Sequence, residues 1–111
     1  MESRIAVYAR VAAAGQTGER SVEQQVERLQ AYARQHSWTV APERVYRDEG
    51  VSGRPLERPG LRGLRAAVAR SEIDVVLVTD PDRLARDATA LDELLNEFER
   101  AEVAVVFRPR H

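Results

Sequence analysis

The chain has no cysteine and only two histidines among its 111 residues. Disulfides and thiolate metal sites are therefore excluded, and His36 and His111 do not form a ligand cluster, so we expect no metal and no cofactor. No apolar run approaches the roughly 20 residues needed to cross a membrane, and the N-terminus lacks a signal-peptide pattern. These absences predict a cytoplasmic protein without a membrane partner.

Lysine is also absent, so all 17 basic residues are arginine, and the formal net charge is -1. A domain that binds DNA by itself usually carries a basic excess, because neutralising phosphates supplies most non-specific affinity. Site-specific DNA binding by this piece alone is therefore not expected. The arginine usage fits a compositional bias of the source genome, although arginine also suits bidentate phosphate contact better than lysine does.

Apolar periodicity predicts alternating strands and helices within one domain spanning residues 1–111. Ser21, with Gln24 three residues later, has the pattern of a helix N-cap, and Pro59 suits the first position of a helix. Pro42 interrupts the second strand, which should therefore be an edge or irregular strand. The predicted strands cover residues 4–8, 38–46, 73–79 and 103–107, and the predicted helices follow Ser21, Pro59 and the charged loop 80–87.

This order predicts an α/β fold with three layers, in which helices cover both faces of a mostly parallel sheet of four to five strands. Right-handed crossovers leave few topologies, and the expected one is a flavodoxin-like strand order. That order has a switch point between the first and third strands, where ligands bind at the carboxyl ends of the strands. Three polar loops leave those ends, so the fold and the loop chemistry predict one site.

Arginines follow two of the predicted strands: Arg10 follows the first, and Arg83 and Arg86 follow the third. Guanidinium groups that converge repel each other unless an anion lies among them, and a phosphate matches their planar geometry. The alternative is that each arginine pairs with a neighbouring carboxylate at the surface. We favour the phosphate cluster because all three positions lie at predicted strand ends and also match the family pattern described below.

Three neighbouring side chains allow a functional and a structural interpretation. Asp82 could orient an arginine or help a proton reach a leaving oxygen. Asp87 is more simply the N-cap of the following helix. Tyr8 is expected in the core with its hydroxyl satisfied.

Several segments, in this order and spacing, resemble the catalytic domain of the serine recombinases, the resolvase and invertase family, and especially its large-recombinase branch. The match covers nearly the whole chain, and although each motif is weak by itself, the set is highly specific. It includes the segments 8–11, 21–29, 46–53, 58–61 and 82–86.

The resemblance implies a resolvase-like fold and a phosphoryl transfer that requires no metal. A serine attacks the scissile phosphodiester, forms a phosphoserine link to DNA, and strand exchange follows, while arginines stabilise the charged transition state. It also adds Asp48, Ser52 and Arg58 to the candidate site. By itself the glycine-containing loop 48–58 would be equally consistent with an ordinary turn between a strand and a helix.

Position 12, where the family has its nucleophilic serine, holds Ala12. A methyl group cannot attack phosphorus, Ser21 is better explained as a helix cap, and nothing in the pattern places Thr17 at the phosphate. We therefore predict no covalent DNA cleavage by this chain. Deliberate removal of the serine and a natural pseudo-enzyme both fit this sequence.

The resemblance also implies segments that residues 1–111 do not contain, namely a long dimerisation helix and DNA-binding domains. The chain is accordingly expected to be a catalytic-domain fragment or a stand-alone relict. Its leading function is that of a recombinase catalytic domain, inactive through Ala12, with DNA as a weak partner and with self-association or association with a recombinase. The alternatives are a non-enzymatic module that modulates an active recombinase, and an unrelated phosphate- or nucleotide-binding protein, which lacks support from any P-loop or dinucleotide fingerprint.

Overall fold

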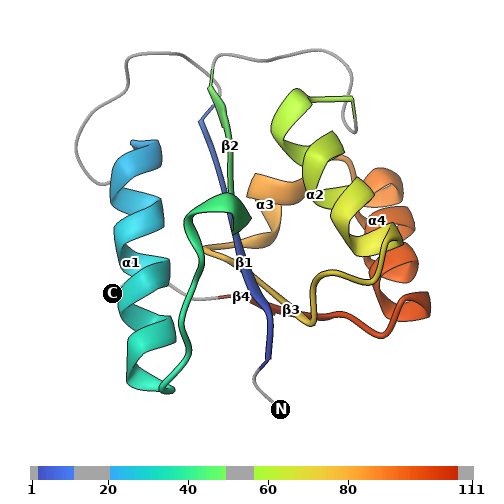
Figure 1. Cartoon of the computed structure of the whole chain (residues 1–111). Helices are drawn as coiled ribbons and strands as arrows, with labels where there is room; N and C mark the ends of the chain where they lie inside the picture. Colours follow the sequence, from blue (N-terminus) through green and yellow to red (C-terminus); the bar gives the residue numbers. More distant parts are fainter. Residues whose placement is uncertain (1–2, 12–20, 50–56, 108–111) are drawn as a thin grey trace.

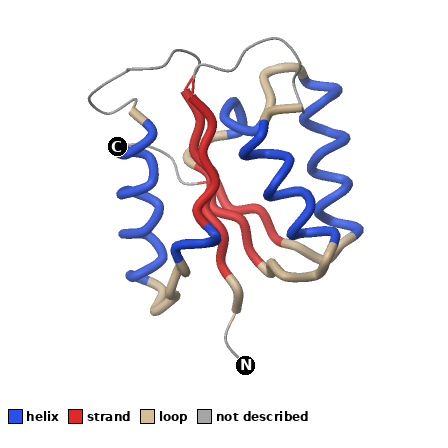
Figure 2. The backbone as a smooth tube through the Cα atoms, turned by 45° about the horizontal axis from the view of Figure 1, so that its top comes forward, coloured by secondary structure: helices blue, strands red, loops and turns tan. Residues whose placement is uncertain are grey.

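The computed structural model describes residues 3–11, 21–49 and 57–107. A sheet lies between helices in this part of the chain, with α1 on one side and α2, α3 and α4 on the other (Figures 1 and 2). In chain order the elements are β1 (Ile5–Val11), α1 (Val22–Gln35), the 3-10 helix η2 (Pro42–Arg44), β2 (Val45–Glu49), α2 (Pro59–Ala69), β3 (Val75–Val78), α3 (Pro81–Leu84), α4 (Ala88–Arg100) and β4 (Ala104–Phe107).

The four described strands form one parallel sheet with the order β2-β1-β3-β4. This confirms the predicted α/β fold and the flavodoxin-like order. β2 lies on one side of β1, and β3 lies on the other side. The switch point is therefore between β1 and β3, as expected.

Side chains of β1 alternate between the two faces of the sheet, and all seven residues of this strand are buried. Ile5 and Val7 pack in a cluster with the apolar face of α1. Ala6 and Tyr8 pack in a second cluster with α2 and α4. Arg10 follows Tyr8 by two positions, so its side chain leaves the sheet on the face that carries α2, α3 and α4.

The predicted helix starts are present. The Ser21 hydroxyl accepts a hydrogen bond from the Gln24 N–H at 3.1 Å, and the Asp87 carboxylate accepts one from the Ala90 N–H at 2.8 Å. Pro59 occupies the first position of α2, where its missing N–H costs no hydrogen bond. These local signals place α1, α2 and α4 correctly.

The ends of the same three helices share a left-handed residue that is not glycine. Ser37, Ser71 and Glu102 have φ values of 60°, 60° and 62°. The residue after each donates its N–H to a carbonyl five positions back, as Val103 does to Phe98 at 2.9 Å, which is the Schellman arrangement. A left-handed backbone costs a non-glycine residue free energy, so these positions store a small amount of strain.

The second predicted strand was wrong in its bounds. It was expected over residues 38–46, but β2 spans Val45–Glu49 and Pro42 begins η2 instead. Proline has no N–H for the ladder, and the residue before it is held in an extended conformation outside the sheet, so pairing starts only after Arg44. The edge position of β2 is confirmed by the strand order.

Two predicted loops are also partly regular structure. β1 continues to Val11, and Arg10 pairs with Asp48 in the β1–β2 register, so both residues belong to strands and not to the loops that follow. The charged segment 80–87 contains the single turn α3, which begins at Pro81. The loops after β1, β2 and β3 are therefore shorter than predicted, and the side chains at the strand ends are held by regular structure.

Candidate active site

Four arginines meet at the carboxyl ends of β1 and β3. Arg10 comes from β1, Arg58 is the N-cap residue of α2, Arg83 lies in α3 and Arg86 follows it. α3 lies beside β1 and β3 in the fold (Figure 1), so segments far apart in the sequence converge here. The predicted convergence of the arginine-bearing segments is present.

The guanidinium group of Arg10 is turned onto main-chain carbonyls of α3. Its Nη2 donates to the Asp82 oxygen at 2.6 Å, and its Nε donates to the Arg83 oxygen at 3.0 Å. Arg83 returns the contact, because its Nη1 donates to the Arg10 carbonyl oxygen at 3.0 Å. The two arginines thus tie the end of β1 to α3.

Gln25 of α1 holds the main chain of Arg10 from the other face of the sheet. Its Oε1 accepts from the Arg10 N–H at 3.1 Å, and its Nε2 donates to the Arg10 carbonyl at 2.9 Å. The side chain is buried, although it is an amide. Sequence reasoning missed Gln25; the available signal was a polar residue on the apolar stripe formed by Val22, Val26 and Leu29.

Arg58 is buried between the sheet and α3. Its Nη2 donates to the Leu84 carbonyl, its Nε lies 4.0 Å from the Asp48 carboxylate, and its guanidinium lies 5.9 Å from the centre of the Tyr8 ring. The last of these is a cation–π distance. Arg58 therefore reaches from the start of α2 to the end of α3.

Asp48 serves as the anchor for the start of α2. Its carboxylate accepts hydrogen bonds from the N–H groups of Gly60 at 2.8 Å and Leu61 at 3.0 Å, which are free donors at a helix N-terminus. It also accepts the Tyr8 hydroxyl at 2.7 Å. Tyr8 is accordingly a core residue with a satisfied hydroxyl, as expected. Its pKa is raised well above the usual range, mainly by burial and secondly by the hydrogen bond to Asp48.

The cluster has a positive electrostatic environment. Burial lowers the pKa of Arg10, and the charges of Arg58, Arg86 and Arg83 lower it further, while Tyr8 acts in the opposite sense. Like charges that disturb one another in this way favour an anion among them. Asp80 supplies one nearby negative charge, since its carboxylate lies 3.8 Å from the Arg83 Nε. Sequence reasoning did not single out Asp80.

The remaining predicted residues are placed differently. Asp82 and Arg86 are exposed, and it is the carbonyl of Asp82, not its carboxylate, that contacts Arg10. An orienting role of the Asp82 carboxylate toward Arg10 has therefore no contact to support it in the described structure. Ala12 and Ser52, together with Thr17, lie outside the described residues.

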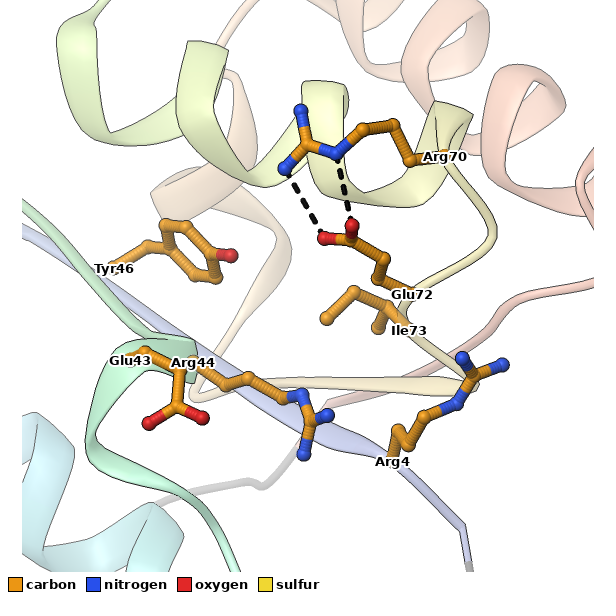
Figure 3. A pocket seen from close by; sticks show the side chains of 7 residues that line it. All are labelled: Arg4, Glu43, Arg44, Tyr46, Arg70, Glu72 and Ile73. Atoms are coloured by element: carbon orange, nitrogen blue, oxygen red, sulfur yellow. Dashed lines mark hydrogen bonds and ion pairs between the residues drawn. The ribbon is translucent and has the colours of Figure 1, made fainter.

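A separate hollow of about 360 Å³ lies at the other end of the sheet, near the start of β2 and the end of α2 (Figure 3). Arg70 and Glu72 form a bidentate pair on one side of it at 3.0 and 3.1 Å, and Arg4, which also lines it, is paired with Asp74. Because most of its charges are matched within the chain, the hollow shows little preference for a ligand of one sign.

The described residues contain no group of three or more metal-ligating side chains that could hold an ion. None of the helices in this part of the chain is both long and apolar enough to span a bilayer.

The comparisons with known proteins agree with one another. The model of the resolvase N-terminal domain matches residues 5–109. A resolvase/recombinase of Pseudomonas putida is 38% identical over 104 residues, which cover 94% of this chain and 50% of that protein. The Tn3 resolvase of Escherichia coli is 36% identical over 104 residues, covering 94% and 49%. The chain thus spans about half the length of these two relatives.

Solved structures show the same likeness. The N-terminal catalytic domain of TP901-1 integrase superposes with a TM-score of 0.85 at 31% identity, covering 94% of this chain and 76% of that one. The C-terminal catalytic domain of ISC1926 TnpA, an IS607-like serine recombinase, superposes with a TM-score of 0.81 at 31% identity, covering 94% and 66%.

Proposed function

This chain belongs to the resolvase N-terminal domain family, and on that premise we propose that it is a recombinase catalytic domain that binds a DNA phosphate but cannot cut beside it. The convergence of Arg10, Arg58, Arg83 and Arg86 at the sheet's switch point supports this proposal most directly. Arginines placed around a phosphoryl group stabilise the charge that develops during its transfer. DNA is the proposed substrate class.

The residues would divide the work by their positions. Arg83 in α3 and Arg86 in the turn after it contact the non-bridging oxygens of the phosphate. The buried Arg10 and Arg58 add positive charge from the protein side of the site. For the exposed Asp82 carboxylate we propose a role in helping a proton reach the leaving oxygen. Asp48 acts indirectly, because it fixes the start of α2 and with it Arg58.

The nucleophile is the missing part. Ala12 follows Val11, the last residue of β1, and offers no lone pair to phosphorus. Ser52, the other hydroxyl implicated by the family pattern, is proposed as a phosphate contact and not as the attacking group. The chain should therefore bind phosphodiesters without forming a covalent link to them.

A second candidate is an interaction module that has kept the fold and modulates an active recombinase by mixed assembly. Ala12 favours it, because a domain that only assembles does not need the attacking oxygen. Co-purification of the chain with a full-length recombinase, at a defined stoichiometry, would support this candidate. A chain that binds phosphodiesters yet never associates with such a protein would exclude it.

The proposal is tested by titrating the labelled chain with a short single-stranded oligonucleotide and following amide shifts by NMR. We expect weak binding, with the largest shifts in residues 81–87, and loss of at least roughly tenfold in affinity in Arg86→Ala, as for removal of a charge-assisted phosphate contact. Arg100→Ala is the matched control, since Arg100 is an exposed arginine at the far end of α4. Equal binding by both variants would contradict the proposal.

A further inference from the structure

The carbonyl groups at the end of α3 are used as acceptors by the buried arginines. A helix leaves its last carbonyls without partners inside the helix. Here the Asp82 and Arg83 oxygens accept from Arg10, and the Leu84 oxygen accepts from Arg58. Donors that would suit a phosphate are thus already engaged with the protein's own backbone.

Both of these arginines are also buried. Arg10 is 6% exposed and Arg58 is 4% exposed, whereas the side chain of Arg83 is 19% exposed and Arg86 is open to solvent. A phosphodiester arriving from outside can reach Arg86 and part of Arg83. It cannot reach the guanidinium groups of Arg10 and Arg58 while α3 covers them.

We propose that α3 is a latch over the arginine cluster, and that a phosphodiester and the α3 carbonyls compete for Arg10 and Arg58. This inference rests on the proposed function, because it concerns the same phosphate site. The structure then represents the closed state. Phosphate engages Arg86 first, and full engagement requires α3 to withdraw its carbonyls.

The energetics favour such an exchange. A hydrogen bond between guanidinium and phosphate is charge-assisted on both sides and is stronger than one to a neutral carbonyl. α3 is a single turn, held internally by the Arg83 N–H to the Asp80 oxygen at 3.1 Å and the Ala85 N–H to the Pro81 oxygen at 3.2 Å. A turn of this length is held mainly by its contacts with the rest of the fold, so losing them should let it open.

Pro81 tunes the closed state. It occupies the first position of α3, where its fixed φ favours the turn before the turn forms. If only the open state binds phosphate fully, the apparent dissociation constant is the intrinsic constant divided by the open fraction. A variant that destabilises the α3 turn should therefore bind phosphate more tightly, even though the charges of the site are unchanged.

The first test is hydrogen exchange of the unaltered chain, with and without the dinucleotide thymidylyl-thymidine, which carries one phosphodiester. The latch predicts faster exchange of the Arg83 and Ala85 amides at saturating dinucleotide, since their turn opens. A ligand that simply settled on the closed site would slow exchange at both amides. Slowed or unchanged exchange would overturn the latch and leave the phosphate site intact.

The second test compares Pro81→Gly with Pro42→Gly. Pro42 occupies the same position in η2, a short helix that precedes β2 at the opposite end of the sheet, so the two variants carry the same chemical change. The latch predicts that Pro81→Gly binds the dinucleotide roughly two- to fivefold more tightly, and that Pro42→Gly binds it like the unaltered chain. Circular dichroism verifies that both variants are folded.

The outcomes separate the two proposals. Binding seen only in Pro81→Gly is the strongest support for the latch. Equal affinity of all three proteins contradicts the latch alone. If none of them binds, Pro81→Gly included, then the phosphate site itself fails and the latch fails with it.

Discussion

Arg10 and Arg83 lie 73 positions apart, and each donates a hydrogen bond to the other's main-chain carbonyl at 3.0 Å. This reciprocal contact fixes the end of β1 against α3, which are two of the segments that carry the arginine cluster. Gln25 completes the arrangement by holding the N–H and carbonyl of Arg10 from α1. The geometry of the site thus depends on three segments that are distant in the sequence.

Replacing Gln25 by methionine should destabilise the fold by about 2 kcal/mol, because a methionine leaves the buried Arg10 N–H without an acceptor. The Arg10 carbonyl keeps the donor from Arg83. Gln24→Met is the control, since the neighbouring Gln24 side chain is exposed and should change the free energy of unfolding by less than about 0.5 kcal/mol. Urea denaturation of the two variants measures the difference, and equal midpoints would refute the role given to Gln25.

Much of the fold was predictable because its signals are local. The apolar run around β3, the N-caps Ser21 and Asp87, and Pro59 at the start of α2 each depend on neighbours in the sequence. The bounds of β2 were not predicted, because an apolar pattern alone does not show where an edge strand begins to pair. Pro42 was seen to interrupt the strand, yet it starts η2 instead.

The site was predictable in its location but not in its contacts. The carboxyl-end rule brought Arg10 and Arg83 together correctly. It could not show that their partners are the carbonyls of α3, since backbone acceptors have no signature in the sequence. Nor could it find Gln25, whose contact with Arg10 depends on how α1 packs across the sheet. The location of the arginines can thus be predicted from the sequence, whereas the hydrogen-bond partners of their guanidinium groups are known only from the structure.

Gly60 should not tolerate a side chain. A Cβ added there would overlap the Arg47 carbonyl oxygen and lie 2.9 Å from the Asp48 carboxylate. Gly60→Ala should therefore cost about 1–3 kcal/mol, the usual range for overpacking. At Gly63 the nearest contact is 3.4 Å from the Tyr46 ring, so Gly63→Ala should be neutral or stabilise α2 by up to about 1 kcal/mol. Thermal unfolding of both variants checks this, and a stable Gly60→Ala protein would contradict the close approach of α2 to β2.

Stability should fall at alkaline pH because of Tyr8. Its pKa in the folded protein lies well above the ordinary value of 10.0, mainly through burial, so the folded chain keeps a proton that the unfolded chain loses. The contribution is fully present below about pH 10 and is lost above it, at up to about 1.4 kcal/mol per pH unit. Unfolding free energies measured between pH 8 and pH 12 should show this slope. Tyr8→Phe should flatten it, and an unchanged slope would count against a buried neutral Tyr8.

Glycine should improve the left-handed end of α4. Glu102 has a φ of 62°, which costs a side chain free energy that glycine avoids. Glu102→Gly should therefore stabilise the fold by about 0.5–1 kcal/mol. Glu99→Gly, three residues earlier inside α4, should instead destabilise it by about 1 kcal/mol. The two exposed glutamates form a matched pair, and shifts of the same sign in differential scanning calorimetry would contradict the assigned helix end.

The central claim, that the phosphate site is retained and only the attacking oxygen is missing, is tested most directly by Ala12→Ser. Supercoiled DNA is incubated with the unaltered chain, with Ala12→Ser, and with Ala12→Ser combined with Arg10→Ala, and protein bound covalently to DNA is measured after denaturation. The account predicts an adduct with Ala12→Ser, none with the unaltered chain, and a strong loss in the double variant. Absence of any adduct from Ala12→Ser, or an adduct that does not depend on Arg10, would contradict it.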